Sequence, residues 1–138
     1  MEQLGYSVTV PLDFETTLLR TREALKEEGF GVVSEIDIRA VLKEKIDADF
    51  RPYTILGACN PHMAKRALEA MPEVGLLLPC NVTVEQTESG MKVTAVDPKV
   101  MMSVVGSHPV LEELVEDAAP RLEREMAALE ASAVGASG

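Results

Sequence analysis

The stretch CNVTVEQTESGMKVTAV, residues 80–96, decides the fold because it contains the clearest β-hairpin in the chain. In its first half Val82 and Val84 alternate with polar residues, which predicts a strand with one buried and one exposed face. Ser89-Gly90 then forms the expected turn, and the alternation resumes as a second strand. An antiparallel pair with one polar face indicates a sheet that helices of the same chain cover on one side only.

Upstream of the hairpin, the sequence predicts three strand-helix units in succession. In each unit a β-branched or apolar run precedes a stripe of apolar residues at helical spacing. Asp13, Asp37 and Asn60 are placed to cap the three helices, and Gly29 ends the first one. The order of elements predicts right-handed βαβ crossovers in this half of the chain. The expected strands are 5–10, 31–35 and 53–59, and the expected helices begin at residues 14, 38 and 61.

Downstream of the hairpin, the sequence predicts two further helices. Asp97-Pro98 opens a short one, and the last one begins near Pro109. Its apolar stripe continues across Pro120, where the helix must kink or restart. We therefore expect the α/β class, tending to α+β.

The expected architecture is a single two-layer domain with a mixed sheet of about five strands. It carries a C-terminal β-hairpin and helices mainly on one face. The domain is expected over residues 1–131, with a flexible tail over 132–138.

Composition excludes several classes of function. The chain has 138 residues, of which 46% are hydrophobic, enough for one core. Its net charge of −10 repels phosphate backbones and anionic lipids, so we expect neither nucleic acid nor membrane partners. The sequence shows no apolar run that could span a bilayer and no signal-peptide pattern, which predicts a cytoplasmic protein. Two cysteines do not make a disulfide framework and are expected to be thiols.

Both cysteines and both asparagines of the chain occur as Cys-Asn pairs, one after an expected strand and one at the start of another. Ligands of α/β sheets bind outside the carboxyl ends of strands, and a thiol next to a helix N-terminus is favoured as thiolate. The candidate ligand-binding residues are Cys59, Asn60, His62, Cys80 and Asn81. Cys59, His62 and Cys80 are the candidate metal ligands, although two thiols and one imidazole leave a tetrahedral site incomplete.

Two geometries are open for the cysteines. If the helix between them is a simple crossover, Cys80 lies roughly 20 Å from Cys59, at the opposite end of its strand. If the extended segment EVGLLLP returns along the sheet first, Cys80 arrives beside Cys59. In the plainest interpretation both thiols are small buried hydrophobes, and Asn60 is only a helix cap.

Other motifs add little. The sequence contains no nucleophile elbow, phosphate-binding loop, dinucleotide fingerprint or zinc-protease motif. Met63, Met71, Met101 and Met102 are most simply core residues, although thioethers beside thiols would also suit a soft metal such as Cu(I).

Two stretches carry a family resemblance: YTILGACNPHMAKRALEAMPEVGLLLPCNVTV, residues 53–84, and VTAVDPKVMM, residues 93–102. With them the chain resembles the bacterial and archaeal domain-of-unknown-function family numbered three hundred and two. The resemblance implies a small independent α/β domain with no established activity or catalytic assignment. The motif positions are Cys59, Asn60, Pro61, Cys80, Asn81, Asp97 and Pro98.

The first hypothesis is a binding module with a pocket around the Cys-Asn pairs. This pocket would bind a small molecule, a soft metal or a cofactor, whose identity the sequence does not indicate. We expect a homodimer, formed through the partly uncovered sheet or the long C-terminal helix. The second hypothesis is a thiol-dependent redox protein or enzyme that uses Cys59 as nucleophile, assisted by the helix N-terminus, with His62 as a further candidate. The third is a purely structural or interaction domain.

Overall fold

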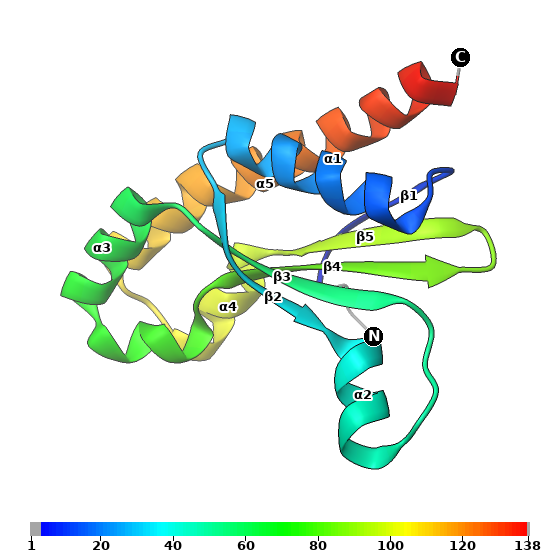
Figure 1. Cartoon of the computed structure of the whole chain (residues 1–138). Coiled ribbons are helices and arrows are strands. Elements are labelled where there is room, and N and C mark those ends of the chain that lie inside the picture. Colours follow the sequence, from blue (N-terminus) through cyan, green and yellow to red (C-terminus); the bar gives the residue numbers. More distant parts are fainter. Residues whose placement is uncertain (1–3, 138) are drawn as a thin grey trace.

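The computed structural model describes residues 4–137 and contains one five-stranded sheet in the order β1-β5-β4-β3-β2 (Figure 1). Helices α1 and α5 lie together over one face of this sheet. The α/β class and the five strands are as expected from the sequence. The elements are β1 (Gly5–Val10), α1 (Phe14–Glu27), β2 (Gly31–Asp37), α2 (Ile38–Ile46), β3 (Tyr53–Cys59), α3 (Pro61–Ala70), the 3-10 helix η1 (Pro72–Leu77), β4 (Cys80–Thr87), β5 (Gly90–Val96), α4 (Pro98–Val105) and α5 (Pro109–Ser137).

Every neighbouring pair of strands is antiparallel, which corrects the mixed sheet and the βαβ crossovers expected for the first half of the chain. Helix α1 leads from one edge strand, β1, to the other, β2, and the hairpin β4–β5 later fills the centre. Helix α2 lies inside the connection of an antiparallel pair, β2 and β3. The local periodicity that predicts strand and helix is the same in both topologies, so it does not report strand direction.

The two faces of the sheet differ as the hairpin pattern predicts. Val82 and Val84 of β4 are 0% exposed and face α1 and α5 in the main core. Thr83 and Glu85, which alternate with them, are only half-buried, and Asn81 is exposed. The second face is therefore left uncovered by the helices of this chain.

Helix α5 continues through Pro120 and past Ala131, after which the sequence predicts a flexible tail. Two contacts hold this end against α1. Arg20 Nη1 donates to the backbone oxygen of Ser132 at 3.1 Å and to its Oγ at 3.0 Å. Ala133 is 1% exposed and belongs to the main core. These contacts explain why the helix extends to Ser137.

Helix α2 stands away from the rest of the molecule (Figure 1). It contains no buried residue, and the adjoining edge strand β2 is exposed over nearly its whole length. Three large apolar side chains of this surface are between 40% and 69% exposed. We call Ile36, Val41 and Ile46, with α2 and the adjoining end of β2, the β2–α2 surface.

Within residues 4–137, no helix combines the length and hydropathy that crossing a bilayer requires.

Candidate functional site

The structure brings the two cysteines together at one end of the sheet. Cys59 ends β3, and Cys80 begins β4 opposite Ala58, the residue just before Cys59. Directly opposed residues of antiparallel strands have Cα atoms about 4.5–5.5 Å apart. The chain turns through α3 and η1 and returns to this end before β4 starts. Cys80 therefore arrives beside Cys59, as in the second of the two geometries, although residues 72–77 form a 3-10 helix and not an extended return along the sheet.

Asn60 is tied into the start of α3 as its capping residue. Its Oδ1 accepts a hydrogen bond from the backbone nitrogen of Met63 at 3.1 Å, and Pro61 follows in the first turn. The turn after α1 packs against the same side chain. A Cβ at Gly29, where φ is +88°, would lie 3.0 Å from Asn60 Nδ2, so this position favours glycine for both conformation and space.

A cavity of about 350 Å³ opens beside the two cysteines. Its walls are the ends of β3 and β4, α3, η1, α4 and the first half of α5. Nearly all the lining side chains are apolar, and the polar ones are Cys59, Asn60 and Cys80. No charged side chain of the described residues lines it. The site is thus an apolar pocket with a few polar groups at the strand ends.

Burial dominates the electrostatics of Cys80. Loss of solvent raises the pKa of its thiol to about 11, and the neighbouring Cys59 adds to the shift. At neutral pH Cys80 is therefore a neutral thiol. Because the thiolate is the nucleophilic form, Cys80 is not activated for nucleophilic attack in this state.

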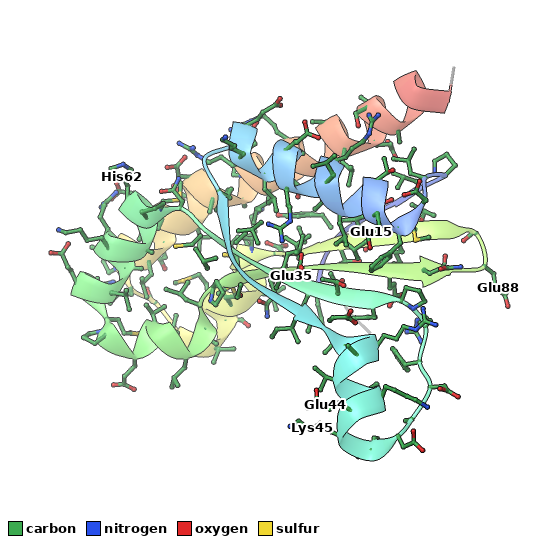
Figure 2. All side chains as sticks on the ribbon, viewed as in Figure 1. Glu15, Glu35, Glu44, Lys45, His62 and Glu88 are labelled. Carbon is green, nitrogen blue, oxygen red and sulfur yellow. The ribbon has the colours of Figure 1, made fainter. Side chains whose placement is uncertain are left out.

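The remaining candidate residues lie outside the cavity. His62 is exposed and lies on the outer side of α3 (Figure 2), and Asn81 is exposed opposite Gly57. Neither residue lines the pocket. The thiol-enzyme hypothesis thereby loses the base that it assigned to His62.

The candidate metal ligands Cys59, His62 and Cys80 do not form one cluster of three in the described residues. Residues 4–137 contain no group of three His, Cys, Asp or Glu side chains that could hold a metal ion. The first turn of α3 carries the imidazole of His62 away from the thiols and toward solvent.

One ionisable group in the interior is absent from the sequence-based candidates. Glu125 of α5 is 0% exposed, and neither of its carboxylate oxygens has a hydrogen-bond partner among the residues that the structure describes. Burial raises the pKa of this carboxyl to about 8. The burial of Glu125 is indicated in the sequence by its spacing from apolar residues. Glu125 stands three residues after Leu122 and four before Leu129, and both leucines belong to the apolar stripe of the helix.

Comparison with known proteins agrees with the sequence resemblance. Residues 6–129 match the family described as Domain of unknown function DUF302. A crystal structure of an uncharacterized conserved DUF302 protein from Bacillus stearothermophilus is similar, with a TM-score of 0.84 and 32% sequence identity. The similarity covers 93% of this chain and 99% of that chain. No curated protein matches. The chain therefore belongs to the DUF302 family.

Proposed function

We propose that this chain is a binding protein for a small, uncharged and largely apolar molecule, held in the cavity beside Cys59 and Cys80. The cavity itself carries the proposal. Its volume of about 350 Å³ and its apolar walls with a few convergent polar groups are typical of small-molecule sites.

The polar groups at the strand ends would orient the molecule. Asn60 Oδ1 already accepts from Met63, so its amide nitrogen and the two thiols are what the site offers a ligand. A carboxylate or phosphate on the ligand would be buried without a cation, which is costly. The lining therefore selects against ionised molecules.

The entrance lies between β2 and α3. Val33 and Leu68 both line the cavity, yet they are 67% and 40% exposed. A ligand can enter beside these two side chains without unfolding the sheet.

The uncharged fluorescent probe N-phenyl-1-naphthylamine tests this proposal. Ala67 lines the cavity from α3 and is 8% exposed, so Ala67→Leu fills part of the space. We expect probe affinity to fall about tenfold or more, which is about 1.4 kcal/mol. Ala127→Leu on the exposed side of α5 is the control and leaves the affinity unchanged. Absence of probe binding, or equal binding by both variants, would contradict the proposal.

We also propose that the chain forms a homodimer through the β2–α2 surface. Helix α5 is the other expected interface, but its apolar stripe is buried within the chain. Leu122, Met126 and Leu129 of this stripe are at most 3% exposed. Helix α2, by contrast, has nine residues and buries none of them. Isolated helices of this length are marginal in water, which favours packing against a partner.

A second copy of the chain fits the charges of this surface. Strand β2 carries the acidic residues Glu35, which pairs with Arg22 of the same chain, and Asp37, and helix α2 carries the exposed basic residues Arg39 and Lys45. Glu35 and Lys45 lie on their separate elements in Figure 2. Two-fold pairing places the acidic strand of one copy against the basic helix of the other, as a self-complementary interface requires.

Sedimentation measures the dimer directly. We expect the wild type to sediment as a dimer and the double variant Val41→Glu with Ile46→Glu as a monomer. Leu19→Glu, at a side chain 58% exposed on α1, is the control and remains dimeric. A wild type that is monomeric at about 100 μM would rule out this interface as a stable one.

A further inference from the structure

Five sulfur-containing side chains line the cavity. Both cysteines of the chain, Cys59 and Cys80, are joined there by Met63, Met101 and Met102. They come from the end of β3, the start of β4, the first turn of α3 and from α4. Met71 belongs to the same apolar cluster but does not line the cavity.

This set of side chains matches one class of ligand. Thiolates and thioethers are soft donors that favour soft ions such as Cu(I), whereas Mg²⁺ and Ca²⁺ require oxygen ligands. The cavity offers sulfur from five residues, and no carboxylate of the described residues lines it. Water and hard cations therefore find few partners on these walls.

We propose that Cys59 and Cys80 together bind one soft monovalent metal ion, and that the thioethers of Met63, Met101 and Met102 complete its sulfur coordination. The copper enters as Cu(I) and stays Cu(I). Both thiol S–H bonds are replaced by S–Cu bonds, and the two protons pass to solvent. Cys59 and Cys80 are both partly exposed, so the single net negative charge of the complex keeps contact with solvent.

This inference goes beyond the proposed small-molecule site, although both use the same cavity. A single ion occupies a small part of about 350 Å³, so the two kinds of ligand are measured separately. The metal is tested with Cu(I) alone, and the apolar site with N-phenyl-1-naphthylamine.

The experiment is an anaerobic competition between the full chain and the Cu(I) chelator bathocuproine disulfonate, with native mass spectrometry for stoichiometry. We expect one ion per chain. Cys59→Ser and Cys80→Ser are each expected to lower the affinity by about 100-fold or more, since a first ligand is lost. The triple variant Met63→Leu, Met101→Leu, Met102→Leu should lower it about tenfold. Met71→Leu is the matched thioether control and should bind as the wild type does.

Three results would overturn the inference. The first is a wild type that retains no ion against the chelator, and the second is two ions bound per chain. The third is wild-type affinity in either single cysteine variant, because the thiols would then act separately. Circular dichroism checks folding, and Cys80→Ala replaces Cys80→Ser if the buried hydroxyl prevents folding. Probe binding without Cu(I) binding would leave the proposed function intact and refute the metal site.

Discussion

Residues 4–137 form two apolar clusters, which differ in how fully they are packed. The main core lies between the sheet and helices α1 and α5, where Leu25, Leu56 and Leu122 are 0% exposed. The second, which we call the cavity cluster, contains Ala67, Val74, Leu111 and Leu114 and surrounds the pocket at the end of the sheet. One cluster is filled by its own side chains, and the other leaves space.

Helix α5 contributes residues to both clusters, so the difference in packing between the clusters does not come from this helix. Its later residues Leu122 and Met126 meet the continuous apolar face of the sheet. Its earlier residues Leu111 and Leu114 meet short helices instead, with small residues such as Ala64 and Ala67 on the facing wall. The continuous surface can be filled side chain by side chain, whereas the facing helix ends cannot close the gap. Stability therefore depends mainly on the first cluster, and space for a ligand is found in the second.

Two leucines of α5 test this comparison with the largest expected effect. Leu122→Ala removes a side chain that is 0% exposed in the main core and should lower the free energy of unfolding by about 3–5 kcal/mol. Leu114→Ala, 7% exposed and already beside the cavity, should cost only about 1–2 kcal/mol. Urea denaturation measures both. Equal losses would mean that the two clusters are packed alike.

Glu125 is an ionisable residue inside the otherwise apolar main core, and the pH dependence of stability should reveal its burial. Burial raises the pKa of this carboxyl from 4.5 to about 8, so the folded chain holds a proton that the unfolded chain releases. The associated stability is fully present below about pH 4.5 and is lost as the pH rises through 8. The free energy of unfolding should therefore fall between pH 5 and pH 9.

Glu125→Gln removes this titration while keeping the shape of the side chain. At pH 5 the variant and the wild type should unfold nearly alike, and at pH 9 the variant should be more stable by on the order of 4 kcal/mol. Chemical denaturation at both pH values gives the difference, and other titrating groups cancel in it. A constant difference at the two pH values would show that Glu125 is not the group responsible.

Most of the fold could be predicted from the sequence, because its signals are local. The alternation around Val82, the caps Asp37 and Asn60 and the ending glycine Gly29 mark elements that the structure contains. Strand direction could not be predicted, because a helical connection serves a parallel or an antiparallel pair equally well. The end of α5 was predicted too early, since Ser132 is held by Arg20, which is 112 residues away in the sequence.

The candidate site was predictable only in part. The helix cap at Asn60 follows from neighbouring residues, whereas the meeting of Cys59 and Cys80 depends on the return of the chain through η1. The exposure of His62 depends on which side of α3 faces the core. The cavity depends on packing between elements that are distant in the sequence. Periodicity over single elements does not contain this information.

Two buried alanines sharpen the comparison at a smaller scale. Ala24→Leu adds three carbons to the main core, where Ala24 is 7% exposed, and should cost about 1–3 kcal/mol through overpacking. Ala67 is 8% exposed but lines the cavity, so Ala67→Leu should change the free energy of unfolding by less than about 0.5 kcal/mol. Thermal melts of the two variants provide the test. A comparable loss at Ala67 would show that the wall of the cavity cannot accommodate added volume.

Substitutions of two helix-capping residues, one for each cluster, compare the clusters through small changes in stability and in probe affinity. Asn60 Oδ1 accepts from the backbone of Met63 at the start of α3, and Asp13 Oδ1 accepts from Thr16 at the start of α1. Asn60→Ala should lower the free energy of unfolding by about 1 kcal/mol and also weaken probe binding, because α3 forms a wall of the cavity.

Asp13→Ala should lower stability without changing probe affinity, since α1 does not line the cavity. The hydrogen bond from Thr16 lowers the pKa of Asp13. The stability that the ionised Asp13 cap contributes is therefore present above the pKa that Asp13 has in the unfolded chain. It is lost as the pH falls through the lowered pKa of the folded chain. Urea denaturation with a probe titration on the same samples separates the two caps. If both substitutions weakened the probe equally, the ligand space would depend on global stability and not on α3, and the division of the molecule into a packed half and an open half would fail.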